Sequence, residues 1–387
     1  MIAHADIYAP TTRRALSVAK ELVKNCHEVS IVIPAPDGTT KLRGLQERRY
    51  GVNIFHSKFS KHDHIHLMDV PGIMVDELQR ILKLEFNIAH AFQAPSISGV
   101  LGVLSRQLKR KPLIIDIDDW EGKGGWADYH PYIQGLAAEI LEKTIPKHCE
   151  AITVASRLLK TRISKLGVPK EKVFYIPNGV DHEKFNPHTN GHYIRSLYSL
   201  SDSPTIVYSG ALHKFYDVDL LISAFSKVKK ACPKAKCLIS GKGSDMNRLK
   251  SLSKRLGLTN SVIFTGWIPD NQYLLFSAMA DISVVPLRDR LIHKAACHGK
   301  IVEYMSMGKP VIAGKVGEAM NYIEHMKSGV LVDPGDAEQL ADAIIRLLQD
   351  KDLAEVLGKN ARRRVLERYT WSILASRFEE VYHKQSA

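Results

Sequence analysis

The chain has 387 residues, of which 45% are hydrophobic and 25% are charged, and this composition excludes a largely disordered, collagen-like or coiled-coil protein. Lysines and arginines outnumber aspartates and glutamates by 54 to 41, so a net charge of +13 favours polyanionic partners: nucleotides, phosphates, nucleic acid or an anionic membrane surface. No apolar run approaches the roughly 18–20 residues of a membrane helix, and residues 1–14 lack a signal-peptide pattern. We therefore expect a cytoplasmic protein.

Short β-branched runs alternate with helical patterns along the chain. In the first half we expect strands at 29–33, 87–90, 113–116 and 151–154, and helices at 13–24, 75–84, 98–109 and 132–145. After residue 190 the pattern restarts, with strands expected at 205–208, 236–239, 262–264, 282–285, 311–313 and 330–332. Such strands, apolar on both faces and separated by helices, predict parallel sheets of the α/β class. We expect two Rossmann-like, doubly wound domains joined near residues 177–202, with ligands in a cleft at the carboxyl ends of the strands.

Several common enzyme motifs are absent from the sequence. No G-x-G-x-x-G follows the first strand, no Gly-Lys pair precedes Ser or Thr, and neither H-E-x-x-H nor G-x-S-x-G occurs. These absences count against dinucleotide dehydrogenases, P-loop enzymes, zinc peptidases and serine hydrolases. His62, His64 and His66 would share one face of an extended segment, but we favour a surface segment over a metal site. Basic clusters at 106–111 and 227–236 are interpreted as solvated faces, with a membrane-surface role as the alternative for the first.

The most informative stretch is KIVEYMSMGKPV at residues 300–311. Residues 295–299 are expected to form a loop that opens a helix near Lys300. The free amides and positive dipole at that end would suit a phosphate. One turn further, Glu303 could accept hydrogen bonds from a ribose diol, although such a glutamate more often only complements the helix dipole.

A second cluster of polar residues follows the strand expected at 113–116. Asp116 and Asp118 share one face of an extended strand, and Asp119 points the other way. Gly122, Gly124, Gly125 and Trp126 come next in the sequence. Acidic residues that end an apolar strand are costly without partners, so we favour a ligand loop over a helix cap or a solvated turn.

These motifs, in this order, resemble the GT-B retaining glycosyltransferases of the GT4 family. The resemblance covers nearly the whole chain and is more specific in the C-terminal half. It is carried by the stretches at 176–187, 208–225, 238–243, 264–269, 300–311 and 329–343.

The resemblance implies a GT-B fold whose two domains face each other across a cleft. Residues 1–185, completed by a C-terminal helix at 371–387, would bind the acceptor, and residues 186–370 the nucleotide-sugar donor. It further implies retaining, metal-independent hexosyl transfer without a cofactor, from a UDP-sugar to a carbohydrate or lipid-linked acceptor in polysaccharide or glycan biosynthesis. The chain could also make peripheral contact with the inner surface of an anionic membrane. Nucleic-acid binding rests on net charge alone, so we expect no nucleic-acid partner.

Individual site residues follow from the same resemblance. Glu303 matches the second glutamate of the E-x7-E element, while the first is replaced by Ala295. The usual arginine after the glycine turn is Ala211; Lys214 is the nearest basic residue, with Arg290, Lys294 and Lys300 as alternatives. Because the motif glutamate and arginine are both absent, a non-catalytic nucleotide-sugar-binding subunit is the alternative function.

The implied donor site also contains Gly210, Gly241, Gly266, Trp267, Ile268, His298 and Gly299. The candidate catalytic residues are Asp118, Asp119, His130 and Lys214. Many relatives carry a histidine in place of Asp118.

Overall fold

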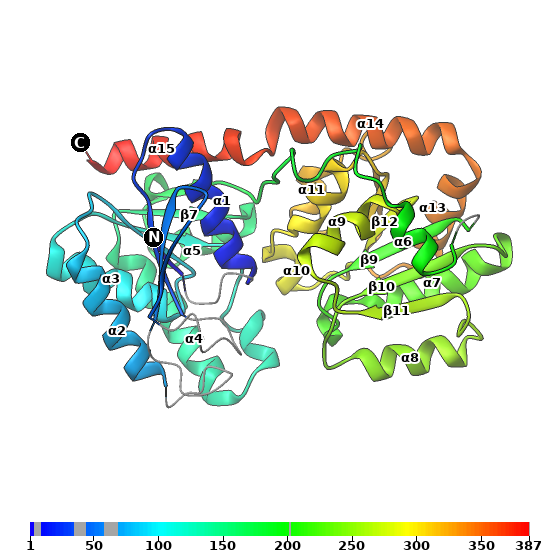
Figure 1. Cartoon of the computed structure of the whole chain (residues 1–387). Helices are drawn as coiled ribbons and strands as arrows, with labels where there is room; N and C mark the ends of the chain where they lie inside the picture. The colour runs from blue at the N-terminus through cyan, green and yellow to red at the C-terminus, as the bar shows by residue number, and fades with distance from the viewer. Residues whose placement is uncertain (4–8, 35–43, 58–68, 201–202, 387) are drawn as a thin grey trace. The chain divides into compact units, whose positions relative to one another are not determined.

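The computed structural model describes residues 1–3, 9–34, 44–57, 69–200 and 203–386 (Figure 1). The chain divides into two compact units. The first comprises Met1–Asn178, Ala295–Cys297 and Trp371–Ala387, and the second comprises Gly179–Lys294 and His298–Thr370. The division therefore falls after Asn178, upstream of the boundary expected at residue 185, and a short segment around residue 296 belongs to the first unit.

The first unit is built on an eight-stranded sheet with the order β3-β4-β2-β1-β5-β6-β7-β8. Its strands are β1 (Ile2–Ala3), β2 (Ser30–Ile33), β3 (Gln46–Arg49), β4 (Val52–His56), β5 (Ala89–Phe92), β6 (Leu113–Ile117), β7 (Ala151–Val154) and β8 (Val173–Tyr175). All pairs are parallel except β3 with β4. The four strands expected from the sequence are confirmed. The β3–β4 hairpin was not predicted, because the polar sequence QERR of an exposed edge strand carries no apolar signature.

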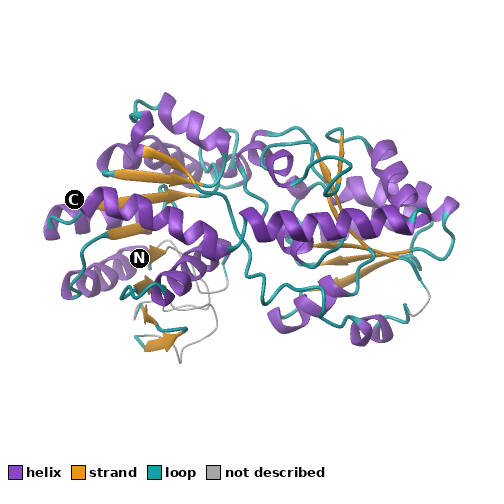
Figure 2. Cartoon of the chain, turned by 90° about the horizontal axis from the view of Figure 1, so that it is seen from above, coloured by secondary structure: helices purple, strands orange, loops and turns teal. Residues whose placement is uncertain are grey.

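Helices lie on both faces of this sheet (Figure 2). They are α1 (Pro10–Lys24), α2 (Val70–Lys83), α3 (Ile97–Lys109), α4 (Tyr132–Thr144), α5 (Arg157–Lys165) and the C-terminal α15 (Trp371–Ser386). Ala15, Val18 and Leu22 form the buried stripe of α1, which packs in one apolar cluster with Leu374 and Phe378 of α15. The C-terminal helix therefore completes the core of the first unit. Burial of its side chains removes apolar area from water, at about 25 cal/mol per Å².

The second unit contains a six-stranded, entirely parallel sheet with the order β11-β10-β9-β12-β13-β14. Its strands are β9 (Thr205–Ser209), β10 (Lys236–Ser240), β11 (Val262–Gly266), β12 (Ile282–Val285), β13 (Val311–Gly314) and β14 (Val330–Val332). The helices are α6 (His192–Leu197), α7 (Val218–Ala231), α8 (Met246–Arg255), α9 (Asp270–Ala278), α10 (Leu291–Ala295), α11 (Gly299–Ser306), α12 (Ala319–Tyr322), α13 (Ala337–Gln349) and α14 (Lys351–Arg368). All six strands were expected from the sequence.

Strand order locates the place where each doubly wound unit should bind a ligand. In the second sheet the order reverses between β9 and β12, and in the first it reverses between β1 and β5. Ligands of open α/β sheets bind at such switch points, beyond the carboxyl ends of the strands. Across the described ranges, no helix combines the length and apolar character needed to span a bilayer.

Candidate functional site

Glycine turns end the strands beside the switch point of the second unit. Gly210 follows β9 with φ of 153°, and Gly241 follows β10 with φ of 142°. The Gly210 N–H donates to Ser240 O at 3.0 Å, and the Gly241 N–H donates to Gly266 O at 2.8 Å. A Cβ at Gly241 would collide with the Gly210 carbonyl oxygen. The predicted glycines therefore allow the loops after β9, β10 and β11 to pack backbone against backbone. With no side chains at these turns, a ligand can approach this edge of the sheet.

Lys300, in the first turn of α11, directs its ammonium at the Gly210 turn. Its Nζ lies 3.4 Å from Tyr208 Oη and over the rings of Tyr208 and Tyr216, at 4.6 and 5.3 Å from their centroids. A Cβ at Gly210 would collide with this Nζ. Burial lowers the pKa of Lys300 to about 8, although Glu303 opposes the shift. Among the residues that the structure describes, no carboxylate forms a salt bridge with it, so the ammonium is a desolvated cation without an ionic partner.

His298 caps the same end of α11 and is buried, with 9% of its surface exposed. Its Nε2 has no hydrogen-bond partner within the described ranges. Burial, together with the charges of His293 and Lys300, lowers the pKa of His298 well below its ordinary value. The ring is therefore neutral at physiological pH. A Cβ at Gly299 would meet no heavy atom within 4 Å, so the space beside the first residue of the helix is open.

Glu303 lies one turn further along α11, where Tyr273 of α9 holds it. The Tyr273 hydroxyl donates to Glu303 Oε2 at 2.6 Å. The next residue, Tyr304, accepts the backbone N–H of Ser209 at 2.9 Å and thereby fixes α11 against the end of β9. The carboxylate is thus oriented by a neighbouring helix, as a ligand-binding acceptor should be.

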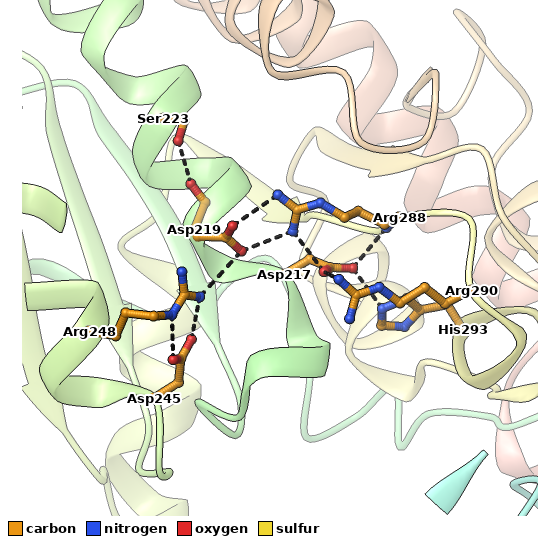
Figure 3. Close-up of polar contacts among 8 residues, drawn as sticks. All are labelled: Asp217, Asp219, Ser223, Asp245, Arg248, Arg288, Arg290 and His293. Carbon is orange, nitrogen blue, oxygen red and sulfur yellow. Dashed lines mark hydrogen bonds and ion pairs between the residues drawn. The ribbon is translucent and has the colours of Figure 1, made fainter. Parts of the chain in front are cut away.

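Asp217 organises the loops after β9 and β12 (Figure 3). It is fully buried and adopts a left-handed conformation, with φ of 55°, at the start of α7. Its carboxylate accepts from the Arg288 side chain and His293 Nε2, both at 2.8 Å, and pairs with Arg290 at 3.1 Å. Burial alone would raise the pKa of Asp217, but the hydrogen bonds from His293 and Arg288 outweigh it and hold the pKa low. The His293 ring lies 5.5 Å from that of His298, so the network extends to the start of α11.

These contacts distinguish the four basic residues that the sequence offered as candidates to bind an anionic ligand. Arg290 is paired with Asp217, and Lys294 is paired with Asp289 at 2.5 Å. Lys214 is exposed in the short 3-10 helix 214–216. Lys300 differs from all three in being desolvated and directed at the glycine turns.

The loop predicted to frame a nucleobase follows β11. Gly266 has φ of 74°, Trp267 is 59% exposed, and Ile268 packs against a small apolar cluster that includes Phe276. Lys242 lies over the Trp267 ring at 5.8 Å. An exposed indole beside a glycine turn provides a flat surface on which a planar ring could stack.

In the first unit, Arg14 and Asp116 form a fully buried ion pair. Arg14 Nε donates to Asp116 Oδ1 at 2.8 Å, and its other nitrogens donate to Ile176 O, Pro177 O and Asn178 Oδ1. Thr153 donates to the same carboxylate at 2.6 Å. Asp116 lies at the end of β6 as predicted, and it pairs with Arg14, which in turn fixes the chain that leaves β8. A buried charge is stable only when its partners are complete.

Asp118 and Gln93 meet at the switch point of the first unit. Gln93 follows β5 with φ of 75°, and its side chain accepts the Asp118 N–H at 3.3 Å and donates to Glu121 Oε1 at 2.5 Å. Asp118 Oδ2 accepts from Thr11 at 3.3 Å, while Oδ1 has no partner among the described residues. Burial and the neighbouring Asp116 charge raise the pKa of Asp118 to about 6. This carboxyl group thus retains an unused hydrogen-bonding atom near neutral pH.

The other residues predicted in this region occupy different positions. Asp119 is exposed. His130 donates from Nδ1 to Trp126 O at 2.9 Å and stacks on the Trp126 ring, with centroids 3.3 Å apart. Of the loop glycines, Gly125 is required by packing, because a Cβ there would collide with the Trp120 carbonyl oxygen. The structure therefore brings the buried Asp118 together with Asp116, while the neighbouring Asp119 is exposed, and the Asp118 charge helps to raise its pKa.

The structure gives no metal site in its described part: no group of three or more His, Cys, Asp or Glu side chains is arranged to hold an ion. His62, His64 and His66 lie outside the described residues. Of the basic clusters, Arg106 pairs with Glu150 at 2.6 Å, and Lys227 pairs with Glu338 and Asp342, both at 2.8 Å.

Four residues that shape the two sites were not predicted: Arg14, Gln93, Asp217 and Tyr273. Arg14 carried a signal, because it lies on the same stripe of α1 as Ala15 and Val18. An arginine on an apolar helix face indicates a buried partner. The other three gave no local signal, since their roles depend on loops brought together from distant strands.

Comparison with known proteins agrees with this arrangement. A sequence profile described as Glycosyl transferases group 1 matches residues 193–364, and one described as Glycosyltransferase Family 4 matches residues 11–184. A GDP-mannose-dependent alpha-(1-6)-phosphatidylinositol monomannoside mannosyltransferase of Mycobacterium tuberculosis is 29% identical over 80% of both chains. An uncharacterized glycosyltransferase of Methanocaldococcus jannaschii is 26% identical over 94% of this chain and 92% of its own.

Solved structures share the fold over the full length. Sucrose-phosphate synthase of Thermosynechococcus elongatus superimposes with a TM-score of 0.83 at 20% identity, covering 99% of this chain and 98% of its own. HepE of Anabaena, solved with UDP and glucose, gives 0.76 at 19% identity and covers 99% of both chains. The two doubly wound units thus define a glycosyltransferase of the GT-B fold. Within that class, the chain belongs to the GT4 family.

Proposed function

We propose that the protein transfers a sugar, with retention of anomeric configuration, from a nucleoside diphosphate sugar to a carbohydrate or lipid-linked hydroxyl group. The second unit would bind the donor and the first unit the acceptor. The observation that carries the proposal is the start of α11, where the Lys300 ammonium lies next to the turn at Gly210, the space beside Gly299 is open, and Glu303 follows one turn later. A UDP-sugar is the donor expected from the sequence, and the mannosyltransferase relatives named as GDP-mannose-dependent make a GDP-sugar the second candidate.

Each group in this cluster has a defined role in the proposed reaction. The bond between the anomeric carbon and the diphosphate oxygen breaks while the acceptor oxygen bonds to that carbon on the same face. The acceptor proton passes to the departing phosphate oxygen, so no separate protein base is needed, and the proposal includes no metal. The α11 amides and the Lys300 ammonium stabilise the negative charge that builds on the leaving group. Glu303, oriented by Tyr273, would accept hydrogen bonds from the ribose hydroxyls.

In the first unit, the proposal assigns Asp118 to the sugar. Its Oδ1 is buried, and no partner for it lies within the described ranges. A sugar hydroxyl that donated to this atom would satisfy it, since a buried acceptor left without a partner costs about 1–3 kcal/mol. Gln93, itself bonded to Glu121, holds the backbone of Asp118, and Thr11 donates to the carboxyl group.

Isothermal titration calorimetry with UDP, GDP and ADP, alone and as sugar conjugates, tests the donor assignment. We expect one nucleoside diphosphate to bind, and Glu303→Gln to weaken its binding by about tenfold, the value of one hydrogen bond to a charged group. Absence of binding to all three would refute the proposal.

A turnover assay that measures nucleotide release with mixed acceptors separates an enzyme from a non-catalytic nucleotide-sugar-binding subunit. The second function is favoured by Ala295, whose buried methyl group replaces the first glutamate of the motif. Asp118→Asn should reduce transfer more than donor binding. Equal losses of both would instead assign Asp118 a purely structural role.

A further inference from the structure

Gln93 joins two acidic residues at the switch point of the first unit. Its side chain accepts the Asp118 N–H and donates to Glu121 Oε1. A backbone N–H can only donate, so the amide oxygen of Gln93 must face Asp118 and its amide nitrogen must face Glu121. Glu121 Oε1 is therefore an acceptor, whatever the charge of that carboxyl group.

The backbone of Gln93 is held in a conformation that glutamine rarely adopts. Its φ of 75° lies in the left-handed region. The Gln93 N–H donates to Asp116 O at 2.8 Å, and the Gln93 carbonyl oxygen accepts from the Ser96 hydroxyl at 2.6 Å. The residue is 1% exposed. Strained residues of this kind cluster at functional sites, where the surrounding contacts hold them in place.

The two carboxyl groups differ in protonation near neutral pH. Burial and the Asp116 charge raise the pKa of Asp118 to about 6. Burial raises the pKa of Glu121 to about 8. The charges of Glu142 and Asp118 add to the shift of Glu121, and the hydrogen bond from Gln93 opposes it. Between these two pKa values, Asp118 is a carboxylate and Glu121 is a carboxylic acid.

Other charged groups surround this pair. Arg14 of α1 lowers the pKa of Asp118, and Asp119 interacts with the charges of both Asp118 and Glu121. Glu142 of α4 accepts the Glu121 N–H at 2.8 Å, and the charge of Arg162 of α5 lowers the pKa of Glu142. The charges that act most strongly on Glu121 are those of Glu142 and Asp118, and both favour its protonated form.

Each carboxyl group keeps one atom for a ligand. Asp118 Oδ2 accepts from Thr11, while Oδ1 has no partner within the described ranges. Because Glu121 Oε1 accepts from Gln93, the acid proton of Glu121 lies on Oε2, and no described residue forms a hydrogen bond with that atom. One carboxylate acceptor and one carboxylic acid donor at the same sheet edge suit a sugar, whose hydroxyl groups can donate and accept.

We propose that Asp118 and Glu121 form one subsite for the acceptor. One sugar hydroxyl donates to Asp118 Oδ1, and a second hydroxyl of the same sugar accepts from Glu121 Oε2. Gln93 is the positioning residue that holds both. The proposal rests on the proposed function and narrows its acceptor to a carbohydrate with at least two hydroxyl groups, since an alcohol with a single hydroxyl would satisfy only one of the two atoms.

Acceptor kinetics at saturating donor test this subsite. The donor is the nucleotide sugar whose nucleoside diphosphate binds in calorimetry. The acceptor probes are methyl glycosides of glucose, mannose and galactose, with ethanol as the single-hydroxyl alcohol. We expect turnover with a glycoside and none with ethanol at equal concentration. At pH 7, Glu121→Ala should raise the KM for the glycoside about tenfold, the value of one hydrogen bond, and leave the Kd of the nucleoside diphosphate unchanged.

Two further variants separate this role from a structural one. Glu121→Gln keeps a donor and cannot ionise, so its KM at pH 7 should stay within about threefold of the unchanged chain. The KM of the unchanged chain should rise above pH about 8, as Glu121 loses its proton, and Glu121→Gln should abolish this rise. Gln93→Asn accommodates the left-handed backbone but is too short to join the two residues, so it should raise the KM and not the Kd of the nucleoside diphosphate. Glu85→Ala is the matched control, because Glu85 is exposed and pairs only with Lys109, and it should match the unchanged chain.

Three results would overturn the proposal while donor binding stays intact. The first is that a nucleoside diphosphate binds but no glycoside supports turnover. The second is that Glu121→Ala has the same KM as Glu85→Ala. The third is that Glu121→Gln is impaired as much as Glu121→Ala, which would assign Glu121 the role of a carboxylate. If no nucleoside diphosphate binds, the proposed function itself fails and this subsite falls with it, so the two failures are distinguished by calorimetry.

Discussion

Replacement of Lys300 by methionine tests whether this residue provides the cation for the donor diphosphate. Methionine retains a long apolar stem next to the Tyr208 and Tyr216 rings and removes only the charge. A hydrogen bond to a charged group contributes about 1.5–3 kcal/mol, so the dissociation constant for UDP should rise by about 10- to 100-fold. Uridine lacks phosphates, and its affinity should not change. Lys294→Met is the matched control, since Lys294 is exposed and already paired with Asp289.

The pH dependence of binding gives an independent measure of the same charge. Burial places the pKa of free Lys300 at about 8. A bound diphosphate would raise that pKa, so Lys300 takes up a proton on binding at pH values between the free and bound pKa. The contribution of the Lys300 charge to UDP affinity is therefore fully present below pH about 8. Above that pH the affinity for UDP falls by up to tenfold per pH unit. In Lys300→Met this dependence should disappear. Calorimetry from pH about 7 to about 10 measures it.

Stability distinguishes a binding role from a structural one. A desolvated ammonium without a carboxylate partner destabilises the folded state, so Lys300→Met should unfold at the same temperature or a higher one. Because the folded-state pKa lies below the usual 10.5, this cost is present below pH about 8 and disappears as pH rises toward 10.5. If the variant binds UDP like the unchanged protein, keeps the pH dependence or loses stability, the assignment of Lys300 is wrong.

Three further predictions concern the fold around the sites. Asp217→Asn keeps a residue that tolerates the left-handed backbone but removes the charge that pairs with Arg288 and His293. It should lower the free energy of unfolding, measured in urea, by about 2–3 kcal/mol. Asp289→Asn is the control, and it should leave that free energy nearly unchanged because the pair between Asp289 and Lys294 is exposed. Burial raises the pKa of Glu77 to about 8. As the pH rises from 4.5 to 8, the unchanged protein should therefore lose up to about 1.4 kcal/mol of stability per pH unit relative to Glu77→Gln. Urea titrations that gave parallel curves of stability against pH for the two proteins would contradict this. Gly241→Ala should destabilise the protein by more than about 1 kcal/mol, because its Cβ would meet the Gly210 carbonyl; an unchanged melting temperature would show that the loops move apart freely.

Much of the second unit follows from local sequence alone. A parallel strand that is buried on both faces needs no alternation of apolar and polar residues, so a short β-branched run is enough to reveal it. The run ISVV at 282–285, which is buried throughout, is therefore recognisable without its neighbours. The turn at Gly210 follows from a residue type with a strong backbone preference. The sequence also placed Asp116 at the end of a buried strand, because an acidic residue directly follows Ile114 and Ile115.

Tertiary structure alone decided which polar groups are paired and which are left for a ligand. The sequence offered four cations near one loop, and only the packing of Asp217 against Arg290 and of Lys300 against two tyrosines distinguishes them. The orientation of α4, which buries Glu142 and leaves Ile133 and Leu136 exposed, was likewise not predictable, because its apolar spacing is that of any core-facing helix. Periodicity reports that a helix has an apolar face. Which way that face turns depends on partners that lie elsewhere in the chain, here the backbone amides that hold Glu142.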